Sequence, residues 1–130
     1  MYGYIRLSIS IRSDVFDYIR HCASENCIIE MLAIYLGGEK EVDHGFLKVD
    51  IVVGDIAIEV KYNANFYDGF GQVLAYKYIL GYPIVYLIHV YDYIPVKFVE
   101  YIFKLAKSIS INAIVLVKYG EKIYEWRTVD

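Results

Sequence analysis

The sequence predicts an α/β domain in which helices flank both faces of a mixed central β-sheet. Two apolar β-branched runs are joined by Gly54-Asp55, which is typical of a tight hairpin. Two further apolar runs of strand length, 84–90 and 113–117, are separated by a helical pattern. Strands that alternate with helices after an initial hairpin indicate a sheet with both antiparallel and parallel neighbours.

Length and composition favour a single domain over residues 1–130. A chain of 130 residues with 58% hydrophobic content can bury one sizeable core, whereas two domains would each be too small. We divide it into a strand and helix extension (1–23), a core (24–118) and an edge hairpin (119–130). No apolar run reaches the about 18 residues of a membrane helix, and the N-terminus lacks a signal-peptide layout. We therefore expect an intracellular, cytoplasmic protein without a membrane span.

The N-terminal part predicts one strand and two helices. Residues 4–11 alternate apolar and polar, which is typical of a strand exposed on one face. Ser13-Asp14 offers an N-cap for a helix to about residue 22. Ser24 caps a second helix over 25–36, and Gly37-Gly38 ends it.

Two cysteines flank the start of the second helix. Cys22 and Cys27 are too few for a zinc site or an iron–sulfur cluster made of cysteines alone. Both are expected to lie in helices, as reduced thiols packed in the core.

The tight turn at Gly54-Asp55 fixes the register of the hairpin. With a two-residue loop, Asp50 is placed directly opposite Glu59. Alternation along the strands divides the side chains between two faces. The core face holds Ile51, Val53, Ile56, Ile58 and Val60, and the other face holds Lys48, Asp50, Val52, Ala57, Glu59 and Lys61.

Two opposed carboxylates need an explanation, because like charges across a strand pair are destabilising. A divalent cation between Asp50 and Glu59, with the Lys61 ammonium beside it, supplies one. The alternative is a solvated hairpin face on which Lys48 and Lys61 neutralise the acids. A purely structural hairpin would more naturally place each acid opposite a lysine, so we favour the metal site.

The second helix contributes another acid. At 100° per residue, Glu25 points with the apolar stripe of that helix, whereas Glu30 points the opposite way. Glu25 also lies in the first turn, where the helix dipole favours a negative charge. It can reach a site from the rim of the core, or it can be an ordinary first-turn glutamate.

The rest of the chain alternates helices and strands. Residues 72–80 predict a helix stopped by Gly81 and Pro83, with Gln72 and Tyr76 on one face. His89 lies inside an apolar strand run, which is typical of a satisfied core histidine. An amphipathic helix is expected from Pro95 to about Ser108, and the final hairpin turns at Gly120-Glu121.

This ordered set of residues resembles the PD-(D/E)XK nuclease superfamily. The resemblance consists of Glu25, Asp50, Glu59-Val60-Lys61, and Gly71-Gln72 with Tyr76, and it spans about residues 25–90. It implies a restriction-endonuclease-like core and a metal-dependent phosphodiester hydrolase, a deoxyribonuclease acting through a metal-activated water. The residue before the key acid is Val49 instead of proline, and the four-cysteine cluster of some relatives is absent from the sequence.

The resemblance also assigns roles. It implies that Asp50, Glu59 and the Val60 carbonyl bind Mg²⁺ or Mn²⁺, with Glu25 holding a second ion or its water shell. Lys61 would orient or activate the attacking water and stabilise charge on the phosphate, and Gln72 would contact the substrate backbone or hold Lys61. Tyr76 would support that arrangement.

The net charge is −3, so DNA binding needs a local basic surface. The candidates are Lys48, Lys61 and Lys77 near the site, with Arg6, Arg12 and Arg20 outside it.

Two other interpretations stay open. Residues 5–11 followed by two helices resemble a ribbon-helix-helix DNA-binding protein, with Arg6, Ser8 and Ser10 as base-reading side chains. A nuclease fold can also serve as a non-catalytic DNA-binding or assembly module. We favour the nuclease, because the ribbon pattern leaves the carboxylate hairpin unexplained. We expect it to act on DNA as a homodimer, because so small a core lacks further domains that could clamp DNA.

Overall fold

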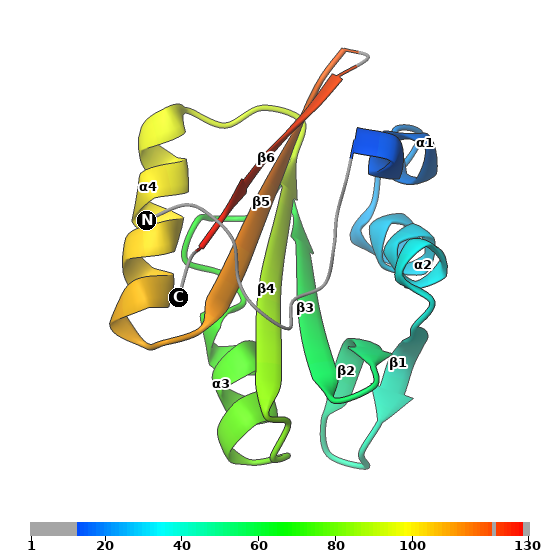
Figure 1. Ribbon diagram of the computed structural model, residues 1–130, viewed down its shortest axis with the longest axis vertical. Coiled ribbons are helices and arrows are strands. Elements are labelled where there is room, and N and C mark those ends of the chain that lie inside the picture. Colours follow the sequence, from blue (N-terminus) through cyan, green and yellow to red (C-terminus); the bar gives the residue numbers. More distant parts are fainter. Residues whose placement is uncertain (1–12, 121, 129–130) are drawn as a thin grey trace.

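A six-stranded mixed sheet forms the middle layer of the protein, and its strands follow one another in chain order (Figure 1). The structure is a computed structural model and describes residues 13–120 and 122–128. Strands β1 (Glu39–Asp43), β2 (Lys48–Val53) and β3 (Ile56–Tyr62) pair antiparallel. Strands β4 (Ile84–Tyr91) and β5 (Asn112–Tyr119) continue parallel to β3, and β6 (Lys122–Arg127) returns antiparallel.

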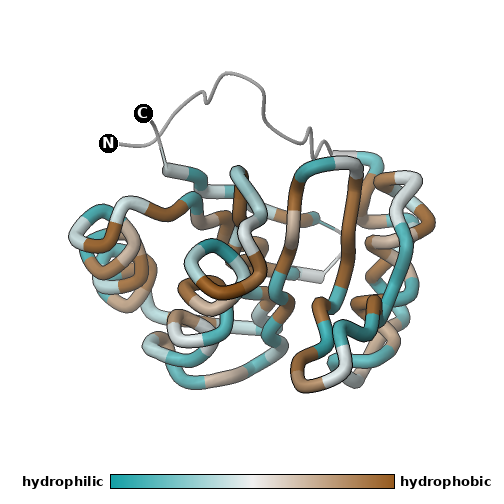
Figure 2. Tube along the Cα trace, turned by 90° about the horizontal axis from the view of Figure 1, so that it is seen from below, coloured by the Kyte–Doolittle hydropathy of each residue, from teal (hydrophilic) through white to brown (hydrophobic). Residues whose placement is uncertain are grey.

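Helices cover both faces of this sheet, as the sequence predicts. A 3₁₀ turn (Ser13–Val15), α1 (Phe16–Ile19) and α2 (Glu25–Leu36) lie on one face. Helices α3 (Phe70–Tyr78) and α4 (Val96–Ser108) lie on the other face. Figure 2 looks along these layers, with helices on either side of the strands. The α/β class and the mixed sheet are confirmed.

The hydrophobic core therefore has two layers, one on each face of the sheet. The layer under α2 contains Ile51, Ile58 and Val60, with Val53 and Ile56 partly buried against it, which confirms the predicted core face of the hairpin. The opposite face of the hairpin is also buried in part, because Ala57 and Val52 pack beneath α3 and α4.

The helix over 25–36 has the expected ends. The Ser24 hydroxyl accepts a hydrogen bond from the Cys27 backbone N–H at 3.2 Å. Gly37 ends the helix in the left-handed region, with φ +70°, where glycine is favoured. Ile28, Ile29 and Leu32, which form the apolar stripe of this helix, are buried.

The structure departs from the sequence predictions in the N-terminal region. The predicted strand 4–11 lies outside the described residues, together with Arg6 and Arg12. The helix expected to reach about residue 22 ends at Ile19. Strand β1 was not expected, because its residues are mostly charged; it lies at the edge of the sheet and pairs only with β2.

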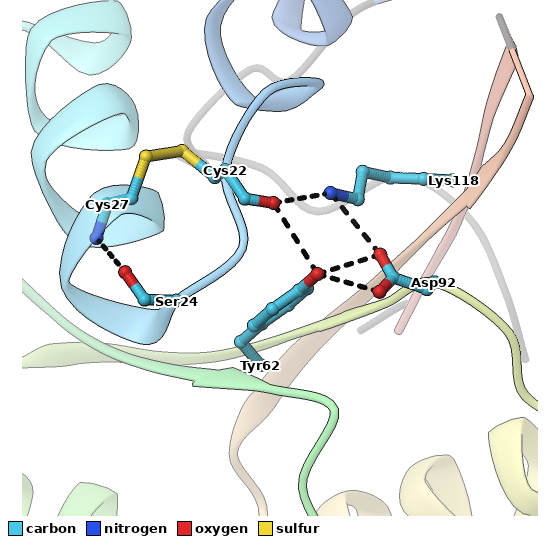
Figure 3. The surroundings of a disulfide bond; sticks show 6 residues. All are labelled: Cys22, Ser24, Cys27, Tyr62, Asp92 and Lys118. Atoms are coloured by element: carbon cyan, nitrogen blue, oxygen red, sulfur yellow. Dashed lines mark hydrogen bonds and ion pairs between the residues drawn. A yellow bond between two sulfur atoms is a disulfide. The ribbon is translucent and has the colours of Figure 1, made fainter.

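The cysteine prediction is wrong. Cys22 and Cys27 form a disulfide, with their Cα atoms 5.3 Å apart (Figure 3). Cys22 follows α1 instead of lying within it, and Cys27 is in the first turn of α2. The bend between the two helices therefore brings the thiols together, which two positions in one continuous helix would not do.

Hydrogen bonds connect the same bend to the carboxyl ends of the parallel strands β3 and β5. The Cys22 carbonyl accepts a hydrogen bond from Lys118 Nζ at 2.9 Å and one from the Tyr62 hydroxyl at 3.4 Å. Lys118 Nζ lies 3.3 Å from an Asp92 carboxylate oxygen, and Asp92 also accepts hydrogen bonds from Tyr62 (Figure 3). These contacts join the bend between α1 and α2 to β3, to β5 and to the residue that follows β4.

No helix within residues 13–120 and 122–128 has both the length and the apolar content to cross a membrane.

Candidate metal centre on the β2–β3 hairpin

The tight turn sets the hairpin register that the sequence predicts. Gly54 has φ +59° at the first turn position, a conformation that glycine adopts readily. Val53 pairs with Ile56, and the ladder continues to Ile51 and Ile58. One residue further, the Asp50 carboxylate accepts a hydrogen bond from the Val60 backbone N–H at 2.9 Å. Asp50 is thereby fixed against β3.

The Asp50 and Glu59 carboxyl groups interact directly. Burial raises the pKa of Asp50, while hydrogen bonds from the Val60 N–H and from Glu59 act in the opposite direction. Burial and then the charge of Asp50 raise the pKa of Glu59 to about 7. Two carboxyl groups in contact share a proton when no cation neutralises them. The predicted meeting of the two acids on one face of the hairpin is therefore what the structure shows.

Glu59 is held from two further sides. Its side chain is only 5% exposed, and the Tyr76 hydroxyl donates a hydrogen bond to Oε1. Lys61 Nζ lies 3.2 Å from Oε2. The Tyr76 hydroxyl also lies 3.2 Å from the Lys48 carbonyl oxygen, so α3 touches both hairpin strands at this point. Tyr76 is a supporting residue of the carboxyl pair.

Lys61 lies in an acidic environment. Burial lowers the pKa of its ammonium group, but the charges of Glu59, Glu25 and Asp50 together outweigh burial and raise it above the ordinary value. Glu25 thus acts on Lys61 through its charge from the start of α2. Glu30 points away and lies 3.7 Å from Lys40 Nζ, which confirms the predicted orientation of the two glutamates.

Gly69 brings the loop before α3 close to the carboxyl pair. It has φ +92°, and a Cβ atom there would lie 2.5 Å from Leu87 Cδ1 and 3.3 Å from Lys61 Cγ. Only glycine allows this approach without displacing its neighbours. Sequence reasoning missed this role, although a glycine directly before a predicted helix was the available signal.

His89 is a core histidine whose two ring nitrogens both have hydrogen-bond partners, as the sequence indicates. It is fully buried and is paired in register with Lys61. Its Nε2 lies 3.0 Å from the Asp68 carbonyl oxygen, and its Nδ1 lies 3.1 Å from the Tyr91 hydroxyl. Burial lowers the pKa of His89 to about 4. Both ring nitrogens are engaged, so His89 has no nitrogen to offer a metal.

Not every predicted substrate residue joins the site. Lys77 Nζ lies 3.4 Å from the carbonyl oxygen of Ser110, just before β5 and two strands away from β3. Lys48 is exposed and reaches the site through its carbonyl oxygen. Gln72 is exposed, one helical turn before Tyr76 on the same face of α3. Arg20 lies 3.9 Å from Asp17.

The donor set of the hairpin suits a hard divalent cation. Asp50 and Glu59 supply carboxyl oxygens, and Val60, whose backbone N–H binds Asp50, is the residue whose carbonyl the resemblance adds to the ligand set. Oxygen ligands of this kind select Mg²⁺ or Mn²⁺ over softer metals. Within the part of the chain that the structure describes, His, Cys, Asp and Glu side chains do not gather in groups of three or more that fit a metal. A cation here would rest on two carboxylates, the backbone and water or substrate oxygens.

Comparisons with known proteins give no family for this chain: no protein-family model, no curated protein and no solved structure matches it.

Proposed function

We propose that the protein is a Mg²⁺- or Mn²⁺-dependent deoxyribonuclease of the PD-(D/E)XK type. The observation that carries the proposal is the contact between the Asp50 and Glu59 carboxyl groups, with the Lys61 ammonium 3.2 Å from Glu59. Two acids in contact at a partly buried place are unfavourable on their own, and a bound cation removes the repulsion.

The order of the elements supports the same class. Helix α2 carries Glu25, β2 carries Asp50, and β3 carries Glu59 and Lys61. Helix α3 follows with Tyr76 against Glu59. This is the succession on which the resemblance to the PD-(D/E)XK nucleases rests.

The chemistry follows from what a phosphodiester requires. A divalent cation at this place would supply positive charge for the non-bridging oxygens and would lower the pKa of an attacking water. Asp50 and Glu59 would hold that cation, and the hydrogen bond from the Tyr76 hydroxyl keeps Glu59 in place. Lys61 lies 3.2 Å from Glu59 and would stabilise negative charge on the phosphate. Gln72, exposed on α3 one turn before Tyr76, would contact the DNA backbone. Two copies of the chain together provide the surface that holds DNA.

The direct test is cleavage of plasmid and branched DNA by the full chain with Mg²⁺ or Mn²⁺, and with EDTA. We expect metal-dependent cleavage that Asp50→Ala abolishes. Asp55→Ala is the matched control, because Asp55 is an exposed acid in the turn of the same hairpin, and this variant should cleave as the wild type does. Equal cleavage by Asp50→Ala, or none by the wild type, contradicts the proposal. Metal-dependent DNA binding without cleavage would favour the non-catalytic module.

A further inference from the structure

A second concave site lies at the carboxyl ends of β3 and β4. It is a pocket of about 530 Å³ between the chain segments 63–67 and 91–95 and Phe98 of α4. The carboxyl ends of parallel strands are where ligands commonly bind in α/β sheets. None of the carboxylates of the β2–β3 hairpin lines this pocket, so it is a site separate from the metal centre.

The pocket is walled by aromatic rings. Phe66 and Phe98 are stacked with their centroids 5.5 Å apart, which gives a rigid base. Tyr67, on the segment after β3, is 58% exposed, and Tyr93, on the segment after β4, is 68% exposed. Two large rings on separate segments at one pocket leave aromatic surface uncovered, which marks a binding site when such surface is contiguous.

The pocket adjoins the metal centre through one loop. Residues 63–67 line the pocket, and the same loop ends at Gly69, which packs against Lys61 and Glu59. The rings of His89 and Tyr91 are stacked, with their centroids 5.5 Å apart. His89 is the register partner of Lys61, and Tyr91 lines the pocket, so this ring pair connects the metal centre to the pocket. Asn63 follows Lys61 by two residues, about 7 Å along the chain.

The charges at the pocket suit an anionic chain. Lys97 is exposed, and its Nζ lies 5.5 Å from the centre of the ring of Phe98, which lines the pocket. The acid of the pocket, Asp92, is neutralised by Lys118 at 3.3 Å and accepts hydrogen bonds from Tyr62 (Figure 3). A ligand with flat rings and phosphates would therefore meet aromatic faces and the Lys97 ammonium beside Phe98, with the one lining carboxylate already paired.

We infer that this pocket stacks an unpaired nucleobase of single-stranded DNA, beside the phosphate held at Lys61. The inference rests on the proposed function and names its substrate class: DNA with a single-stranded segment or end. Bases stack on exposed aromatic side chains whatever their sequence, and cations track the backbone. In a base-paired duplex the faces of the bases are covered by their neighbours, so a duplex would leave Tyr67 and Tyr93 without a stacking partner.

The test compares two probes that differ only in their bases. Wild-type protein in EDTA is titrated with a labelled 12-residue oligothymidylate and with an abasic oligonucleotide of the same length and charge. We expect the oligothymidylate to bind about 5- to 150-fold more tightly, as stacking of one base implies. Tyr67→Ala and Tyr93→Ala should each reduce this preference and leave the abasic affinity unchanged.

Two further variants serve as controls. Tyr67→Phe keeps the ring and should keep the preference. Tyr78→Ala removes a tyrosine that is 69% exposed at the end of α3, away from the pocket, and should also keep it. Equal affinity for the two probes, an unchanged preference in Tyr93→Ala, or tighter binding of a proline-rich peptide overturns the inference.

The two proposals fail in distinguishable ways. Because the titration contains no divalent cation, a preference for bases can persist when no DNA is cleaved, and that outcome supports the pocket while it contradicts the nuclease. Metal-dependent cleavage without any preference for bases contradicts the pocket alone.

Discussion

The two faces of the sheet differ in what they bury. Under α2 the core is mostly aliphatic, with Ile28, Leu32 and Ile58 fully buried. It also contains the ring of Tyr86 and the Cys22 sulfur, which are neutral. Under α3 and α4 the core includes the Glu59 carboxyl and the His89 imidazole. A buried ionisable group lowers stability unless partners satisfy it. The difference indicates that the α2 face stabilises the fold, while the α3 face holds groups that need a cation or specific hydrogen bonds.

The largest expected effect lies on the α2 face. Leu32→Ala leaves a cavity at a side chain that is 0% exposed. It should lower the free energy of unfolding by about 3 to 4 kcal/mol, measured by urea denaturation. Its affinity for Mn²⁺ should not change, because the candidate metal centre is on the opposite face. A loss below about 1 kcal/mol would show that the α2 layer is not the main support of the fold.

The pH dependence of stability should reveal the buried acid. The folded protein keeps the Glu59 proton up to a pKa of about 7, whereas the unfolded chain releases it near 4.5. The wild type should therefore lose stability relative to Glu59→Gln as the pH rises through this window, by about 2 to 3 kcal/mol.

His89 makes the comparison with the variant necessary. Its lowered pKa has the opposite sign, so that the stability it contributes is lost as the pH falls from its ordinary value of 6.5 through about 4. Both proteins contain His89, and the difference between their two denaturation series cancels its effect. A difference that stays constant with pH would mean that Glu59 is ionised in the folded protein.

The disulfide is expected to add to the stability of the α2 face. Replacing Cys22 and Cys27 by serine removes a bridge that closes a short loop and should cost about 2 kcal/mol in unfolding free energy. The reduced wild type should match the double variant in thermal unfolding. If reduction leaves the melting temperature unchanged, the bond is absent from the protein in solution.

A smaller difference in stability is expected between alanine substitutions at two glycines that both have positive φ. Gly69→Ala meets Leu87 Cδ1 at 2.5 Å, whereas Gly54→Ala has no atom within 4 Å of the new Cβ. Gly54→Ala should cost about 1 kcal/mol from its backbone conformation. Gly69→Ala should cost at least about 1 kcal/mol more, since packing at Lys61 is also disturbed. Equal denaturation midpoints for the two variants would show that the loop before α3 accommodates the added methyl group without a loss of stability.

Much of the candidate site could be predicted because its determinants are local. Gly54-Asp55 sets the hairpin register, and alternation along β2 and β3 then places Asp50 and Glu59 on one face. The ends of α2 follow from Ser24 and Gly37, whose capping chemistry depends on neighbours a few residues away.

The remainder depends on contacts between distant segments. The cysteine bridge requires the bend between α1 and α2, which the sequence does not indicate. Lys77 was assigned to the site from its place in the chain, but the packing of α3 directs it to Ser110. Strand β1 is too polar to show a buried pattern. The aromatic pocket is formed by two loops about 30 residues apart in the chain, so no local sequence pattern predicts it.

The central claim is that Asp50 and Glu59 share a hard divalent cation, and thermal unfolding tests it most directly. In EDTA, Asp50→Asn should melt above the wild type, because the repulsion with Glu59 is relieved. Saturating Mn²⁺ should raise the melting temperature of the wild type and of Asp55→Asn by several degrees and leave Asp50→Asn unchanged. A wild type that ignores Mn²⁺, or an Asp50→Asn variant that is stabilised equally, would contradict the account.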